Sequence, residues 1–223
     1  MLKVDNLSYA YSDKYLFENL GFHLDIKTII KISGSNGSGK TTFLKNIAGI
    51  LKNYEGNIYF KDENIKDMSF PNIFYTGHRN GFKNNLTIKE NLNNDLRARD
   101  LNLNDVKKYF SSFGCDISFS SLLGNYSEGQ KKKVLSSLFA ATQADLYVLD
   151  EPFSNLDAKG IDYLNNVFEK KINDGSSIIF TSHENQGQNF KEINIDDYKK
   201  WIIFLKEFLW KSLYLIKKDQ VLI

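Results

Sequence analysis

The feature that most constrains this 223-residue chain is the stretch GSNGSGKT at residues 34–41. It fits the pattern G-x-x-x-x-G-K-[ST] completely, and it stands between an apolar run, TIIKIS, and a segment with helical spacing, FLKNIAGIL (43–51). Gly34, Gly37 and Gly39 permit backbone conformations that residues with a Cβ resist, so successive amides can turn inward around an anion. The motif predicts a phosphate-binding loop at a helix N-terminus, with a ligand-free glycine-rich turn as the alternative.

The side chains of this loop indicate the ligand that it holds. The Lys40 ammonium is placed to reach the β- and γ-phosphates of a nucleotide, and the Thr41 hydroxyl is a ligand for Mg²⁺. We therefore expect ATP and Mg²⁺ as cofactors. The residues expected to bind the nucleotide form one continuous set: Gly34, Ser35, Asn36, Gly37, Ser38, Gly39, Lys40, Thr41 and Thr42.

A pair of acidic residues ends the apolar segment LYVLDEP. Asp150 is placed to hold Mg²⁺ through water, as P-loop NTPases require. Glu151 can polarise the water that attacks the γ-phosphate. An acidic pair after a strand is also typical of the region around a helix N-cap, which is the alternative interpretation. The phosphate loop favours the catalytic interpretation.

Composition and patterning narrow the class of protein. The net charge of +2 provides no broad basic field, so nucleic-acid binding has no support from charge. A single cysteine excludes an internal disulfide, the first residues contain no signal-peptide h-region, and the longest apolar run (201–205) is too short to span a bilayer. We expect a cytosolic protein.

Strand and helix patterns alternate along both ends of the chain. Strands are expected within 1–33, in GNIYFKDENI, before Asp150 and in SSIIFTS, and a helix at 158–173, while IFY (73–75) is a short apolar run that ends in a turn. Between them, residues of about 87–140 are polar and helical. This order predicts an α/β core with a helical insertion.

Three further motifs carry a resemblance to a known family. YSEGQKKKV (126–134), SNLD (154–157) and Ser182-His183 follow in the same order as in the ATP-binding subunits of ABC transporters, which the chain resembles from residue 1 to about 198. The resemblance implies an α/β P-loop NTPase of the ABC ATPase type, with a RecA-like core, an antiparallel β lobe and an inserted helical lobe. The expected division is an ATP-binding domain at 1–200 and a C-terminal tail at 201–223.

The resemblance also implies a head-to-tail dimer. In that family the signature sequence binds the γ-phosphate of the nucleotide held by the other subunit, which assigns Ser127, Gly129 and Gln130 to nucleotide binding, and Asp157 of SNLD with them. Glu128 replaces a glycine of the family pattern, as Tyr126 replaces a leucine, and a carboxylate that points inward would weaken the dimer. The other interpretation of SEGQKKK is a capped helix with a solvated basic face, and the two are compatible.

One histidine and one tyrosine match family positions beside the nucleotide. His183 matches the switch histidine that contacts the γ-phosphate. Tyr11 matches the aromatic residue that stacks on adenine. Tyr9 and Tyr15 are close in the sequence, and a core tyrosine is the alternative for Tyr11.

His78 occupies the position of a family glutamine that contacts Mg²⁺ and the attacking water, eight residues before Leu86-Thr87. A neutral imidazole can ligate a metal or accept a proton, so the role can survive, and a turn histidine is the alternative. The surrounding segment, FYTGHRNGFKNNLTIKENL, together with VLDEPFSNLD, resembles the ATP-binding subunits of haem exporters in cytochrome c maturation.

That resemblance implies an ATP hydrolase, peripheral on the cytoplasmic face of the inner membrane. Its partners would be a second ATP-binding subunit and transmembrane permease subunits, with no nucleic acid and no direct contact with the transported substrate. The alternatives are the ATPase of another exporter, for a lipid, drug or polysaccharide, and a soluble non-transport ABC ATPase.

The segment 201–223 combines many large apolar residues with lysines that fall broadly on one side of a helix. Three interpretations remain open: a final helix packed on the core, a helix in the membrane interface, or a contact with the transmembrane partner.

Overall fold

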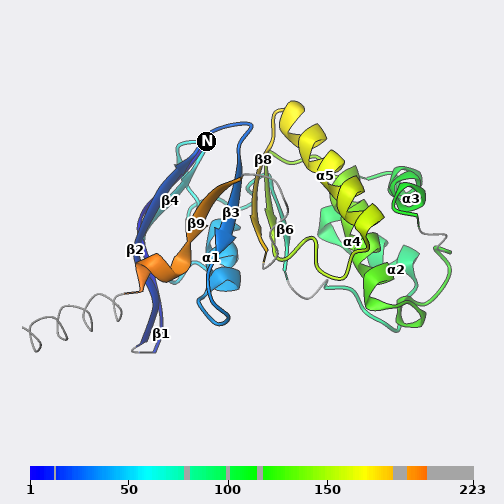
Figure 1. The fold of residues 1–223 in the computed structure, drawn as a ribbon, viewed down its shortest axis with the longest axis horizontal. Helices are drawn as coiled ribbons and strands as arrows, with labels where there is room; N and C mark the ends of the chain where they lie inside the picture. Colours follow the sequence, from blue (N-terminus) through cyan, green and yellow to red (C-terminus); the bar gives the residue numbers. More distant parts are fainter. Residues whose placement is uncertain (13, 78–80, 99–100, 115–117, 183–189, 200–223) are drawn as a thin grey trace, which may run out of the picture.

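The computed structural model describes residues 1–12, 14–77, 81–98, 101–114, 118–182 and 190–199, and it contains two sheets (Figure 1). The first sheet is antiparallel, with the order β2-β1-β4-β5. Its strands are β1 (Leu2–Tyr11), β2 (Lys14–Leu24), β4 (Glu55–Phe60) and β5 (Glu63–Asn64). β1 pairs with both β2 and β4, so the N-terminal strand lies inside this sheet.

The second sheet is parallel and has the order β6-β7-β8-β3-β9. Its strands are β3 (Ile29–Ser33), β6 (Ile73–Thr76), β7 (Leu146–Leu149), β8 (Ser177–Thr181) and β9 (Lys191–Asn194). Every residue of β7 and β8 is buried, as expected for central strands with both faces covered. The carboxyl ends of these strands meet at one edge, where ligands bind in open α/β sheets.

Helices cover both faces of the parallel sheet. The α-helices are α1 (Lys40–Ile47), α2 (Ile88–Asn93), α3 (Leu103–Ser112), α4 (Glu128–Ala141) and α5 (Ala158–Asn173). Short 3₁₀ helices are η1 (Leu96–Ala98), η2 (Leu123–Asn125) and η3 (Ile195–Tyr198). α1 lies between the two sheets, and α2 to α5 lie on the far side of the parallel sheet (Figure 1). None of the helices in the described part of the chain is long and apolar enough to cross a membrane.

The parallel sheet divides the apolar interior into two cores. In β8, Ile178 and Phe180 pack into the core formed with the helical side, whereas Ile179 packs into the core shared with the antiparallel sheet and α1. Side chains of β7 alternate in the same way, with Tyr147 on the helical side and Val148 on the other. This arrangement confirms the expected fold class.

Helix α1 differs in its limits from the pattern at 43–51. It begins at Lys40, directly after the glycine loop, and it ends at Ile47. Gly49, with a φ of 70°, donates to the Asn46 carbonyl at 3.0 Å, and Ile50 donates to the Lys45 carbonyl at 2.9 Å. These two bonds form a Schellman motif, so the apolar spacing continues past the true end of the helix. The helix expected at 158–173 is confirmed as α5.

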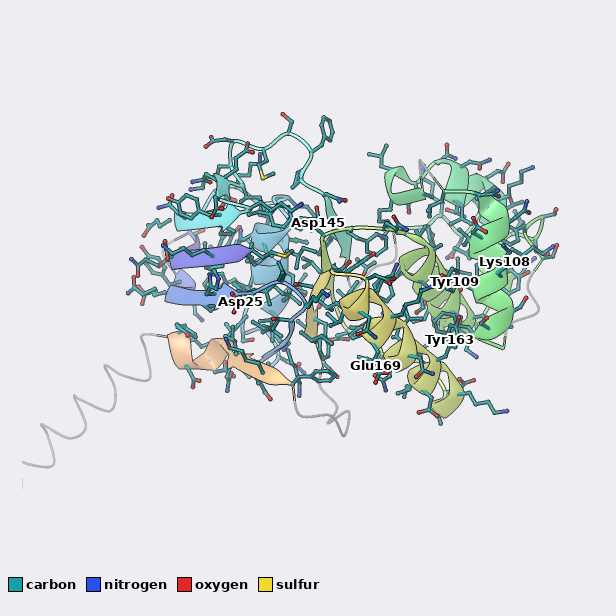
Figure 2. All side chains as sticks on the ribbon, turned by 90° about the horizontal axis from the view of Figure 1, so that it is seen from above. Asp25, Lys108, Tyr109, Asp145, Tyr163 and Glu169 are labelled. Atoms are coloured by element: carbon teal, nitrogen blue, oxygen red, sulfur yellow. The ribbon has the colours of Figure 1, made fainter. Side chains whose placement is uncertain are left out.

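A polar contact joins the antiparallel sheet to the parallel one. The Asp145 carboxylate accepts from Lys61 Nζ at 2.6 Å and from Asn72 Nδ2 at 3.0 Å. Figure 2 shows Asp145 between the strand-rich part and the helical part, far from Lys108 and Tyr109 on α3. The contact is largely exposed, so its contribution to stability is expected to be small.

Candidate functional site

The phosphate loop connects the end of β3 to the start of α1. Gly34, Gly37 and Gly39 all have positive φ, at 144°, 75° and 101°. A Cβ on Gly39 would lie 3.2 Å from the Leu16 side chain, which would have to shift, and the positive φ itself favours glycine there. Lys40 Nζ donates to the carbonyl oxygens of Gly34, at 2.8 Å, and of Ser35, at 3.1 Å, which holds the ammonium within the loop.

Asp150 is the centre of a buried hydrogen-bond network at the carboxyl ends of the strands. Its side chain accepts from the Thr41 hydroxyl at 2.7 Å through Oδ2, and from the Thr181 hydroxyl at 2.7 Å through Oδ1. The residue is only 2% exposed, and a buried carboxylate requires such partners. A threonine hydroxyl and a carboxylate side by side are the hard oxygen ligands that Mg²⁺ prefers, so these residues fit that ion.

The main chain of Glu151 is fixed on both sides. Its N–H donates to Thr181 Oγ1 at 2.8 Å, and its carbonyl accepts from Lys132 Nζ at 2.6 Å and Ser154 Oγ at 2.9 Å. Its φ of 50° lies in the left-handed region, which is uncommon for a residue with a Cβ. Since α5 is capped by Asp157 instead, the N-cap interpretation of the acidic pair is wrong.

The pKa values of a lysine and a tyrosine near the acidic pair are shifted from their ordinary values. Burial lowers the pKa of Lys132 to about 8, although the negative charges of Asp150 and Glu151 oppose that shift. Burial raises the pKa of Tyr75 to about 12, and the charge of Asp150 adds to the effect.

A cavity of about 410 Å³ brings many of the expected nucleotide-binding residues together. Its lining is Tyr11, Leu16, Asn36, Gly37, Ser38, Gly39, Lys40, Thr41, Thr42, Asp150 and Glu151. Tyr11 is 61% exposed, and its ring meets the buried Tyr9 ring edge-on at 5.5 Å. The core interpretation therefore applies to Tyr9 and is wrong for Tyr11, which presents a free apolar face at the cavity.

The start of the loop is held by the C-terminal part of the described chain. Asp196, in η3, accepts from the Ser35 N–H at 2.6 Å and from the Ser35 hydroxyl at 2.9 Å. Lys199 Nζ donates to the same hydroxyl at 3.2 Å. Gly34 and Ser35 do not line the cavity, and Asp196 has no recognisable motif around it in the sequence.

The signature residues are assembled at the start of α4, outside the cavity lining. Ser127 is the N-cap and exchanges hydrogen bonds with Gln130 in a capping box. A Cβ on Gly129 would lie 2.8 Å from the Asn155 carbonyl oxygen, so only glycine fits against the SNLD segment. Glu128 pairs with Lys131 Nζ at 2.8 Å, which offsets the negative charge that replaces the family glycine.

The lysine run after the signature does not form a solvated face, so that part of the sequence interpretation is wrong. Lys131 and Lys133 are 7% and 9% exposed, and Lys132 is half-buried. Lys133 pairs with Asp157 at 2.9 Å, and this contact lowers the pKa of the carboxyl. Asp157, as N-cap of α5, also accepts from the Gly160 N–H. The capped-helix part of the interpretation is confirmed.

Several expectations concern residues outside the described part of the chain: His78, His183 and the segment 201–223. Thr181, Lys132 and Asp196 are functional candidates that sequence reasoning missed. Thr181 lies one residue before the Ser-His motif, and only its hydrogen bonds to the acidic pair reveal its place in the network.

Solved structures of known proteins share this fold. An ATP-binding protein from Pyrococcus furiosus superimposes with a TM-score of 0.76 at 22% identity, covering 89% of this chain and 98% of that one. A dimeric ATP-binding cassette in a post-hydrolysis state, bound to ADP and Pi, gives a TM-score of 0.72 at 20% identity, covering 87% and 94%.

Sequence relatives place the chain within a family. The cytochrome c biogenesis ATP-binding export protein CcmA of Shewanella oneidensis is 30% identical over 190 residues, covering 84% of this chain and 88% of that protein. The protein of the same name from Rickettsia bellii is 34% identical over 189 residues, covering 82% and 93%. Residues 17–154 match the family described as ABC transporter. The chain therefore belongs to the ABC transporter family, as one of its ATP-hydrolysing subunits.

Proposed function

We propose that the chain drives an ABC transporter complex that exports haem during c-type cytochrome biogenesis. The observation that carries the ATPase part is the network from Thr41 through Asp150 and Thr181 to Glu151, placed at the open cavity of the phosphate loop. The names of the relatives, cytochrome c biogenesis export proteins, support the biological role. Another exporter is the alternative.

The residues around the cavity have different roles in ATP binding and hydrolysis. Lys40 and the amides of the glycine loop hold the β- and γ-phosphates, and the exposed face of Tyr11 stacks on adenine. Thr41 and, through water, Asp150 would hold Mg²⁺, which when bound would neutralise charge on the phosphates. Glu151 accepts a proton from the attacking water at a carboxylate oxygen.

We assign His78 and His183 to the same reaction from their family positions. His78 would contact the metal and the attacking water, and His183 the γ-phosphate. Both lie outside the described residues, so these assignments rest on the sequence alone.

A second copy of the chain would complete each site. Ser127, Gly129, Gln130 and Asp157 lie outside the cavity that the phosphate loop forms, although the start of α4 is suited to a phosphate. A head-to-tail dimer with a two-fold axis brings the signature of each chain over the loop of the other. The pairing of Glu128 with Lys131 supports this role, because it offsets a charge that would repel the phosphate.

An apolar groove of about 900 Å³ provides a surface for the membrane partner. It lies between α1, the segment 69–77 that includes β6, and η1, and its lining includes Phe70 and Leu96, which are 95% and 83% exposed. Large apolar side chains this exposed typically mark a protein contact. We assign the groove to a cytoplasmic segment of the permease, which places the chain peripherally on the cytoplasmic face of the inner membrane.

Co-purification tests both the partner and its surface. The affinity-tagged chain, expressed in its own cell, is expected to bring down haem-exporter membrane subunits. Phe70→Asp and Leu96→Asp should abolish that capture while the isolated protein still hydrolyses ATP. Ile26→Asp is the control, because Ile26 is 66% exposed and does not line the groove.

Capture of the permease of a different exporter would contradict the haem assignment and favour the alternative. Capture of membrane subunits by both groove variants at the wild-type level would contradict the groove. Absence of any membrane partner would contradict the transporter role.

A further inference from the structure

We propose that Lys132 is a positioning residue for hydrolysis: from the signature helix it fixes the main chain of Glu151, and through it the carboxylate. The inference rests on the proposed role of Glu151 as the base. It adds a residue that neither the signature nor the acidic motif contains.

The first argument is the contact itself. Lys132 lies in the second turn of α4, and its Nζ donates to the Glu151 carbonyl oxygen at 2.6 Å. The two residues are separated by 19 positions in the sequence, so the bond joins two different parts of the fold. A charged donor makes this a stronger hydrogen bond than one between neutral groups.

The second argument is the conformation that the bond supports. Glu151 has a φ of 50°, and a residue with a Cβ persists in this region only when its surroundings fix it. Ser154 also donates to the same carbonyl, from its hydroxyl at 2.9 Å and its N–H at 3.3 Å. Ser154 belongs to the same turn as Glu151, so among these three bonds only that of Lys132 anchors the turn to another element.

The third argument is that packing does not explain a lysine here. The side chain lines a small apolar space together with Thr76, Leu135, Ser136, Phe139, Leu149, Pro152 and Leu164. Burial of an ammonium among such groups is unfavourable unless partners compensate for it. The negative charges of Asp150 and Glu151 act on Lys132 and favour its charged form, and the carbonyl of Glu151 is its hydrogen-bond acceptor. The lysine is therefore explained by the acidic pair.

Lys132 also differs from its two neighbours. Lys131 pairs with Glu128 within α4, and Lys133 pairs with Asp157 at the start of α5. Only Lys132 in this run contacts the residue assigned as the base. Since α4 begins at the signature, the Lys132 side chain connects the element proposed to meet the second nucleotide with the main chain of the residue assigned as the base.

The experiment compares Lys132→Met with a matched control, Lys171→Met. Lys171 is more buried than Lys132, has a pKa that burial likewise lowers to about 8, and donates to a main-chain carbonyl, that of Thr142, away from the site. We expect Lys132→Met to lower kcat on the order of tenfold or more with KM for ATP within about twofold, because misplaced catalytic groups affect the chemical step. Lys171→Met should change neither by more than about twofold at a temperature where both variants are folded.

A double variant separates positioning from a general structural effect. If Lys132 acts through Glu151, adding Lys132→Met to Glu151→Gln should change the small remaining rate by less than about twofold. Should Lys132→Met not fold, Lys132→Gln takes its place in both comparisons, with the same direction expected.

An unchanged kcat in a folded Lys132 variant would overturn the inference. An equal loss in the wild-type and Glu151→Gln backgrounds would overturn it as well. Failure of the proposed function has a different signature, since Glu151→Gln alone would then hydrolyse ATP at the wild-type rate.

Discussion

The phosphate loop and the start of α4, where the signature lies, are both held by well-defined local contacts, but only the loop lines a cavity. Residues 36–42 of the loop and helix start, with Asp150 and Glu151, line a cavity within one chain. Ser127, Gly129 and Gln130 are equally well fixed, by a capping box and by close contact with the SNLD segment, yet they lie outside that cavity. One edge is therefore a pocket within the chain, whereas the other is a surface, which we propose closes the pocket of a second copy.

The largest expected effect removes the base on the pocket side. Glu151→Gln keeps the shape and the main-chain bonds but loses the proton acceptor, so kcat should fall about 10²- to 10⁴-fold. ATP should still bind, because Lys40 and the loop are unchanged. Phosphate-release kinetics and equilibrium binding measure the two properties separately, and wild-type turnover would disprove the assignment of Glu151.

The next effect removes the cation of the loop. Lys40→Ala deletes a charge-assisted contact to the phosphates, worth about 1.5–3 kcal/mol, which corresponds to a loss in affinity of about ten- to 150-fold. Titration with a fluorescent ATP analogue gives the Kd. Unchanged binding together with unchanged turnover would show that the phosphate-loop assignment is wrong.

A smaller effect on ATP binding is expected from the loss of the contact between Asp196 and Ser35 at the start of the loop. Asp196→Asn keeps one oxygen acceptor but removes the charge that holds the N–H and hydroxyl of Ser35. A loss of about 0.5–1.5 kcal/mol is expected for one such bond, so the Kd for ATP should rise by about two- to tenfold. The same titration measures it, with Asp197→Asn as the control on the neighbouring residue. Equal Kd values for wild type and Asp196→Asn would show that the loop does not depend on η3.

Local patterns in the sequence predicted the pocket edge well. Each of three features depends on one continuous segment of sequence: the loop, the apolar strand before Asp150 and the helix at 158–173. The structure contains all of them. The end of α1 was missed, because apolar spacing continues through Gly49 while its backbone conformation ends the helix.

The lysine run shows what one segment does not reveal. Lys132 and Lys133 donate hydrogen bonds to residues 19 and 24 positions later in the sequence, Glu151 and Asp157. A run of three lysines after a helix cap is typical of a solvated face, and only the tertiary structure brings acidic segments against it. Asp196 was missed for the same reason, since its partner Ser35 is 161 residues away.

The central claim is that the pocket of one chain is completed by the signature of another, and ATP-dependent dimerisation tests it most directly. Light scattering of Glu151→Gln without nucleotide should give the mass of one chain, 25.7 kDa, and twice that mass with Mg-ATP. Adding Ser127→Arg, which blocks the start of α4 but leaves the loop intact, should return the protein to a monomer that still binds ATP. A Glu151→Gln protein that stays monomeric with saturating Mg-ATP, or a Ser127→Arg double variant that dimerises as fully as Glu151→Gln, would contradict the shared site.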